Sequence, residues 1–306
     1  MSRTLVDIVP CPAALVQDAL ELVLRELPPE HRDSIAAQVA ADSYAQTAVS
    51  STLFVAQLGD RLCGAAWGQL QPGKTAIFWV PQLTQGVDAK IAERLTQAVA
   101  RALDYANVEM AQTLLPDRSS TIASAIESGG FSYLAELMYL AGESSPILDD
   151  RSDRESLEFI AYDDSQRGRL IDLVERTYLE SHDCAAMNGK RQMDDVLDGY
   201  QATGDYRPGN WLIVRGDGLD VGVLLMSEEP AAGHFELIYM GVVPEARGKG
   251  WGVQIARHAL RLAHGAGAER VVLAVDAANG PALAMYGAAG FTMWDRRSVF
   301  VRFRGS

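Results

Sequence analysis

The sequence lacks any run of about 18 uncharged apolar residues, which is roughly the length that a membrane-spanning helix needs. Its first residues, Met-Ser-Arg-Thr-Leu-Val-Asp-Ile, also lack the apolar stretch of a secretion signal. Cysteine is scarce, and Cys11, Cys63 and Cys184 are too scattered for a disulfide framework or a zinc site. We therefore expect a cytoplasmic protein with free thiols, no bound metal and no membrane association.

Basic residues are outnumbered, with 27 lysines and arginines against 40 aspartates and glutamates and a net charge of -13. Nucleic-acid phosphates require a basic face on the protein, so nucleic acid is not an expected partner. Acidic surfaces are common for reasons of solubility, and the charge favours a cationic or neutral acceptor only weakly.

A polar, charged stretch at residues 146–156 separates two halves with the same order of elements. We predict one domain over 1–145, a linker, and a second domain over 157–306, because 306 residues suit two domains of ordinary size. Each half is expected to end in a short helix, a Gly-Phe pair and a final strand. Hydrophobic periodicity predicts the other elements. In the first half we expect strands at 53–57, 62–69 and 76–80 and helices at 89–105 and 122–128. In the second half we expect helices at 167–178 and 253–263 and strands at 211–214, 221–226, 235–243 and 270–275.

The stretch Met240 to Gly252 carries the strongest functional signal. An apolar strand leads into three alternating glycines, Gly248, Gly250 and Gly252, that open an amphipathic helix. Glycines allow a ligand close to the backbone, and the first amides of a helix attract anions. With Arg247 and Lys249 beside them, these glycines predict a pyrophosphate cradle.

The glycine spacing distinguishes between kinds of nucleotide site. It does not match the Gly-Xaa-Gly-Xaa-Xaa-Gly of dinucleotide folds, and these glycines are not followed by the Gly-Lys-Ser/Thr of a triphosphate site. The pattern Arg-Xaa-Xaa-Gly-Xaa-Gly, formed by Arg247, Gly250 and Gly252, resembles the GNAT family of acyl-CoA-dependent N-acyltransferases. Within that family the chain resembles the tandem-domain mycothiol synthases.

The resemblance covers most of residues 157–304 and implies an α/β fold of two tandem GNAT-like domains, each a mixed central β-sheet flanked by helices. It implies acetyl-CoA as cosubstrate, without a metal. The cofactor-binding residues that it indicates are Met240, Val242, Arg247, Gly248, Lys249, Gly250, Trp251, Gly252 and Asn279. The backbone of Met240 and Val242 is expected to pair with the pantetheine arm, and Asn279 either caps the next helix or contacts that arm, or both.

Acyl transfer to an amine requires a base for the amine proton and an acid for the leaving thiolate. Glu236 is the candidate base, because a carboxylate among apolar neighbours has a raised pKa. His234 is the alternative base, since histidine titrates near neutral pH. The resemblance places Tyr286 beside the thioester sulfur, as the candidate acid; core packing is its alternative role.

The first half lacks the cradle, since Val80 to Asp88 contains one glycine and no arginine. We therefore predict a degenerate domain that has a structural or acceptor-shaping role. The acceptor wall is expected within residues 177–206, whose acidic residues are suited to an ammonium group or belong to an ordinary solvated loop. Cys184 lies there, but direct transfer needs no covalent intermediate on a thiol.

The favoured interpretation is an N-acetyltransferase that acts on a primary amine of a small molecule in a ternary complex. One alternative is a non-catalytic acyl-CoA sensor, in which Glu236 and Tyr286 only pack. Another is an acetyltransferase for protein lysines or amino termini. Acceptor identity, acyl chain length and oligomeric state stay open at this point.

Overall fold

The computed structural model describes residues 6–41, 49, 51–145, 157–183, 187 and 189–305. The chain forms two compact units: residues 1–134 together with 298–306, and residues 135–297. Both units are mixed β-sheets flanked by helices, which confirms the predicted fold class. No helix in the described part is long and apolar enough to cross a membrane.

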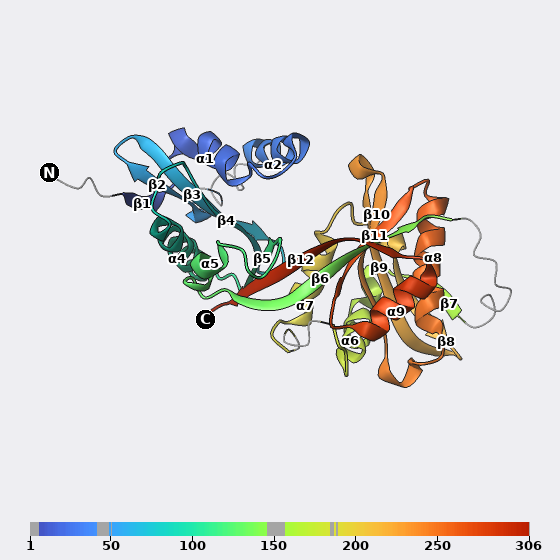
Figure 1. Cartoon of the computed structure of the whole chain (residues 1–306). Coiled ribbons are helices and arrows are strands. Elements are labelled where there is room, and N and C mark those ends of the chain that lie inside the picture. The colour runs from blue at the N-terminus through green and yellow to red at the C-terminus, as the bar shows by residue number, and fades with distance from the viewer. Residues whose placement is uncertain are drawn as a thin grey trace. The chain divides into compact units, whose positions relative to one another are not determined.

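The first unit is built on the strand order β1-β2-β3-β4-β5-β12. Only β4 and β5 run parallel. Helices α1 (Val16–Val23) and α2 (Pro29–Ala41) lie on one face, and α4 (Lys90–Tyr105) and α5 (Ala123–Glu127) lie on the other (Figure 1). The strands are β1 (Asp7–Pro10), β2 (Leu53–Leu58), β3 (Arg61–Gln71), β4 (Thr75–Leu83), β5 (Met110–Leu115) and β12 (Thr292–Phe303).

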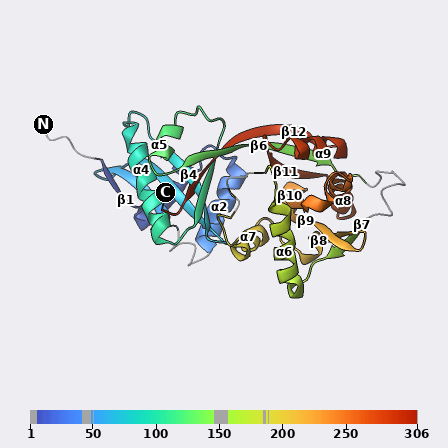
Figure 2. The same ribbon diagram turned by 90° about the horizontal axis from the view of Figure 1, so that it is seen from below.

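The second unit has the order β6-β11-β10-β9-β8-β7, and only β10 and β11 run parallel. Helices α6 (Arg167–Tyr178) and α7 (Met193–Gln201) cover one face; α8 (Trp251–Gly265) and α9 (Gly280–Ala289) cover the other (Figure 2). The strands are β6 (Ser132–Glu143), β7 (Leu157–Ala161), β8 (Trp211–Gly216), β9 (Leu219–Glu229), β10 (His234–Val242) and β11 (Arg270–Asp276).

The long helices form because apolar residues recur at three- and four-residue intervals. In α8, Ile255, Ala256 and Ala259 are fully buried against the sheet. In α4 of the first unit, Leu95, Val99 and Leu103 are likewise fully buried. Cys11 and Cys63 are buried free thiols, whereas Cys184 lies outside the described residues.

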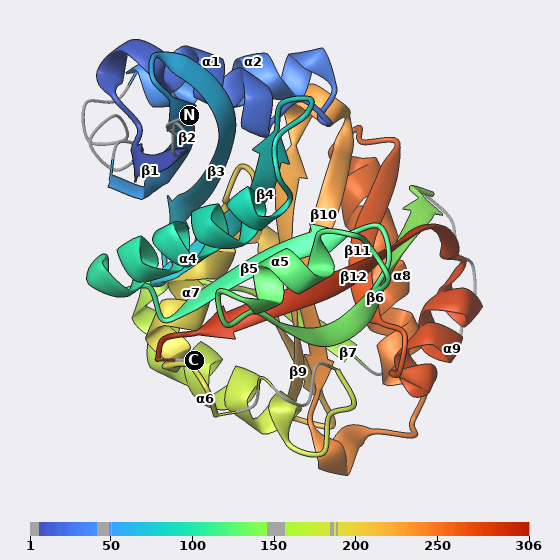
Figure 3. The same cartoon turned by 60° about the vertical axis from the view of Figure 1, so that its left-hand side comes forward.

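Each unit is completed by a strand from the other half of the sequence. β6 pairs antiparallel with β11 in the second unit, and the end of β12 pairs antiparallel with β5 in the first (Figure 3). Arg302 of β12 is only 5% exposed and donates to both carboxylate oxygens of Asp104 at 2.8 and 2.6 Å. The units therefore differ from the predicted halves, in which each half keeps its own final strand; the predicted linker, residues 146–156, lies outside the described residues.

Candidate active site

The sheet of the second unit opens between its two parallel strands. β10 and β11 pair only from His234 to Glu236, opposite residues 270–272. β11 then continues beside β6, while β10 bulges between Leu237 and Tyr239 and continues to Val242 beside β9 alone. In the described structure, the last part of β10 thus has a free edge on its β11 side.

The peptide groups of Met240 and Val242 point toward this free edge. The amide of Val243 donates to the Val221 carbonyl, on the β9 side, at 3.0 Å. Because successive residues of an antiparallel strand direct their peptide groups to opposite sides, Val242 and Met240 direct theirs away from β9. The Val242 carbonyl accepts from Arg247 Nε at 3.0 Å, which leaves the Val242 amide and both groups of Met240 for a ligand.

The predicted cradle follows directly between β10 and α8. Gly248 and Gly250 adopt φ values of 80° and 77°, and Gly250 is the N-cap residue of α8. A Cβ atom on either glycine would meet no heavy atom within 4 Å, so the space in front of the helix is open. The N-cap residue Gly250 has no side chain with which to cap the first amides of α8, and these amides can therefore bind an anion.

Gly252 has a different role from the two glycines before it. A Cβ atom there would lie 3.1 Å from Cγ of Met285, on α9. This glycine lets α8 and α9 pack closely, and it does not widen the cradle.

The cationic rim that the sequence suggests is only partly available. The Arg247 guanidinium donates to the carbonyls of Thr177, Leu179 and Glu180 at 2.9, 2.8 and 3.1 Å, and so caps the end of α6. Lys249 lies 4.4 Å above the ring of Trp251 and 3.2 Å from the exposed carboxylate of Asp217. Lys249 is therefore the rim cation that remains accessible, while Arg247 fixes the loop.

Glu236 is the residue at which β10 and β11 part. Its side chain is half-buried, and burial raises the pKa of the carboxyl, with a further contribution from the negative charge of Glu229. His234 lies two residues earlier, hence on the same face of the strand. Both candidate bases therefore lie at the start of the open edge.

Tyr286 lies on α9, whose start is built as the sequence indicates. Asn279 is the N-cap residue and its side chain accepts from the Ala282 amide at 3.2 Å. Tyr286 is 6% exposed, packs edge-on against Phe291, and has a pKa raised by burial and by the charge of Asp183. Its phenol therefore stays protonated at neutral pH.

The segment after α6 reaches the same region through Asp183. The carboxylate of Asp183 accepts from the Asp276 amide, at the end of β11, at 3.2 Å. Burial of this carboxyl raises its pKa. Of the acidic residues predicted to receive an ammonium group, Asp194 is instead paired with Arg167 at 2.9 Å. Asn188 and Cys184 lie outside the described residues.

Three tyrosines form a wall that the sequence analysis missed. Tyr178 and Tyr200 share a hydrogen bond between their hydroxyls at 3.0 Å, and Tyr239 shares one of 2.6 Å with Thr177. The Tyr239 ring contacts both other rings, at centroid distances of 5.5 and 5.7 Å. This wall joins α6 and α7 to β10, beside the open edge.

The first unit has the same opening without the same chemistry. Its parallel strands β4 and β5 also pair over three residues, Thr75 to Ile77, so Ile77 occupies the position of Glu236. The Thr84 amide bonds the Cys63 carbonyl as the Val243 amide bonds Val221. Counting back from there, Pro81 takes the place of Met240, and proline has no amide to offer.

The first unit also has other residues at the positions that correspond to the candidate acid Tyr286 and to the cradle. The Phe131 amide bonds the Ile126 carbonyl as the Phe291 amide bonds Tyr286, so Ile126 stands where the phenol would be. At the start of α4, the Asp88 carboxylate accepts from the Lys90 amide at 2.9 Å, where a phosphate would have to bind. These replacements support the prediction that the first half is degenerate.

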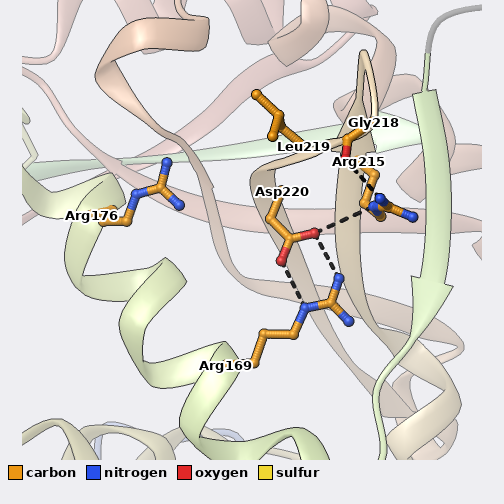
Figure 4. Close-up of a pocket in the computed structure, with 6 residues that line it drawn as sticks. All are labelled: Arg169, Arg176, Arg215, Gly218, Leu219 and Asp220. Carbon is orange, nitrogen blue, oxygen red and sulfur yellow. Dashed lines mark hydrogen bonds and ion pairs between the residues drawn. The ribbon is translucent and has the colours of Figure 1, made fainter.

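An open hollow in the described part lies between α6 and the β8–β9 turn (Figure 4). Asp220 binds Arg169 through two hydrogen bonds of 2.7 and 2.6 Å and lies 3.6 Å from Arg215. Arg176, on the same helix, pairs with Glu245. The arginines that line the hollow are thus already paired with carboxylates, and neither Glu236 nor Tyr286 lines it.

Comparison with known proteins agrees with this geometry. Residues 172–291 match the model of the acetyltransferase (GNAT) family. Over 66 residues the chain is 41% identical to a mycothiol acetyltransferase of Arthrobacter sp. strain FB24, a stretch that covers 22% of this chain and 20% of that protein. The match thus spans about a fifth of this curated relative's length.

Solved structures share the fold of the whole chain. A GCN5-related N-acetyltransferase from Sphaerobacter thermophilus is 15% identical, with 98% of this chain and 96% of that chain covered and a TM-score of 0.64. A tandem GNAT protein from the clavulanic acid biosynthesis pathway is 14% identical, with 99% of both chains covered and a TM-score of 0.54. The chain thus has a tandem GNAT fold, and residues 172–291 match the GNAT family of acetyltransferases.

Proposed function

We propose that the second unit transfers an acetyl group from acetyl-CoA to a primary amine of a small molecule, by direct attack in a complex of both substrates. The observation that carries this proposal is the parting of β10 and β11 at Glu236. It leaves a free strand edge that has a candidate base at one end and an open, uncapped helix start at the other.

The residues present fit acetyl-CoA along this edge. The diphosphate binds the first amides of α8 beside Gly248 and Gly250, with Lys249 as the nearby cation. The amide groups of the pantetheine arm pair with Met240 and Val242 as an added strand does. The thioester then lies toward Glu236, and α9 supplies Tyr286.

The protein supplies a proton acceptor and a proton donor for the reaction. Glu236 takes a proton from the ammonium form of the acceptor, and the neutral nitrogen attacks the thioester carbon. A C–N bond forms, the C–S bond breaks, the leaving thiolate takes the Tyr286 proton, and the nitrogen gives up its second proton, which restores the phenol. A carboxyl with a raised pKa suits the first step, because it accepts a proton near neutral pH more readily than an ordinary carboxylate.

A calorimetric titration of acetyl-CoA into the full chain tests the proposal, in combination with turnover assays of Glu236→Gln. We expect one site per chain, unchanged affinity in the variant, and turnover with amines lowered at least about 100-fold, the usual minimum for a lost general base. Glu175→Gln, an exposed glutamate on α6, is the matched control. Absence of binding would overturn the proposal.

Two other functions give different results in the same experiment. Binding without turnover on any small amine, in the wild type, would favour an acyl-CoA sensor. Transfer to peptides in preference to small amines would favour a protein acetyltransferase.

A further inference from the structure

Four polar side chains share one face at the start of the open edge. Cross-strand register pairs Glu229 with His234, and Ser227 with Glu236. Residues two apart on a strand point to the same side, so all four side chains lie on one face of β9 and β10. Tyr239, opposite Leu225, continues this face and bonds Thr177 of α6, so it is the face that α6 and α7 cover.

Ser227 is the unusual member of this group. It is 0% exposed, and its hydroxyl has no hydrogen-bond partner among the described protein atoms. An unpaired buried hydroxyl is energetically unfavourable, so proteins rarely leave one without a ligand or a water molecule beside it. The orphan hydroxyl therefore points to a ligand beside it.

The Ser227 hydroxyl and a carboxylate oxygen of Glu229 both lie close to Gly204. A Cβ atom on Gly204, in the segment after α7, would be 2.8 Å from Ser227 Oγ and closer still to Glu229 Oε1. Glu229 in turn raises the pKa of Glu236 through its charge. Two carboxylates and an unpartnered hydroxyl thus lie on one strand face at the start of the open edge.

No described lysine or arginine neutralises the two carboxylates. The neighbouring Glu228 shows the contrast, since it pairs with Arg207 at 3.2 Å and accepts from Asn210 at 3.0 Å. Like charges held together without a counter-ion are unfavourable, unless a cation of the ligand joins them. An ammonium group has three N–H donors, and Glu229, Glu236 and Ser227 offer three acceptors.

We propose that Glu229 and Ser227, together with the base Glu236, form the subsite that receives the acceptor's ammonium group. The acceptor is accordingly a small primary amine that enters as a cation and carries no carboxylate beside its amine. Glu229 is the residue that determines this specificity. This inference rests on the proposed function, since it identifies the substrate class of the same site.

Calorimetry and kinetics on the full chain test the subsite with four probes: ethanolamine with its matched acid glycine, and 1,4-diaminobutane with 4-aminobutanoate. We expect the wild type loaded with CoA to bind ethanolamine and not glycine. Glu229→Gln should weaken binding of the cationic probes at least tenfold and leave the acetyl-CoA affinity unchanged. Glu229→Asp should recover part of the binding, and Glu175→Gln should match the wild type.

The pH dependence of kcat/KM distinguishes a charged role of Glu229 at the site from a purely structural one. Removal of the Glu229 charge lowers the pKa of Glu236, so the acid limb of kcat/KM should shift to lower pH in Glu229→Gln. If ethanolamine does not bind to the wild type, or binds equally to the variant, the subsite is refuted. If ethanolamine binds through Glu229 but is not acetylated, the subsite stands and the transferase proposal fails.

Discussion

Glu236 and Ile77 occupy the same place in their two units: each is the last of three residues through which the parallel strands pair before they part. The two openings are therefore alike in backbone, and they differ in the side chains that surround them. One of these differences, Pro81 in the place of Met240, can be transferred from the first unit to the second.

Transfer of the proline from the first unit tests the strand edge. Met240→Pro removes one amide that points away from β9, and Pro81 shows that a strand of this kind accommodates proline there. We expect acetyl-CoA affinity to fall about tenfold, the equivalent of one lost hydrogen bond, with little change in Tm. Met240→Leu is the control, and equal affinities in both variants would show that this amide does not hold the cofactor.

Removal of the phenol tests the candidate acid. Tyr286→Phe should lower kcat about 100-fold without changing acetyl-CoA affinity, because the hydroxyl is needed only as the thiolate leaves. Tyr105→Phe, at a tyrosine that is 92% exposed, is the matched control. Unchanged turnover in Tyr286→Phe would leave this residue with a packing role against Phe291.

The raised pKa of Glu236 predicts a pH-dependent effect on stability. A folded-state pKa above the unfolded one means that the ionised carboxylate destabilises the fold at high pH; the cost disappears below about pH 4.3, the ordinary glutamate value. Glu236→Gln should therefore raise Tm by a few degrees at pH 8 and not at pH 4. An equal gain at both pH values in thermal unfolding would contradict the burial argument.

Substitution of Arg302 tests how much its ion pair with Asp104 contributes to holding β12 in the first unit. Arg302→Met should destabilise the first unit by about 3 kcal/mol, because it leaves a carboxylate without its buried partner. Hydrogen exchange should accelerate in β5 while β8 serves as the internal reference, and Arg101→Met, at an exposed residue of α4, should have no effect. Exchange in β5 as slow as in the wild type would mean that the ion pair contributes little.

The same pair gives a pH dependence of the opposite sign. Hydrogen bonds from Arg302 lower the pKa of Asp104, so the stabilisation is present above the ordinary aspartate value, about 3.9, and is lost as the pH falls through the lowered pKa. The difference between wild type and Arg302→Met should disappear in acid.

The sequence predicts individual elements well where periodicity decides them. Helix α6 has the predicted bounds, Arg167–Tyr178, and α8 exceeds the predicted 253–263 by two residues at each end. Periodicity does not predict the exchange of β6 and β12, because an apolar strand fits equally well beside either sheet. Long-range pairing of this kind is decided by tertiary contacts.

Some features of the site can be predicted from local motifs, and others depend on long-range contacts. The cradle and the N-cap residue Asn279 follow from local motifs. The position of Ser227 opposite Glu236 depends on the register across the β9–β10 turn, which no local motif specifies. Arg247 was expected to bind phosphate, and its guanidinium instead bonds carbonyls at the end of α6, some seventy residues earlier in the chain.

The position of β12 determines the order in which a newly synthesised chain can be finished. During synthesis β5 is made before every element of the second half, and β12 is made after all of them. Until then β5 is an edge strand with unpaired peptide groups, which is the kind of surface that aggregates or recruits chaperones. The unit that is synthesised first is therefore the one completed last.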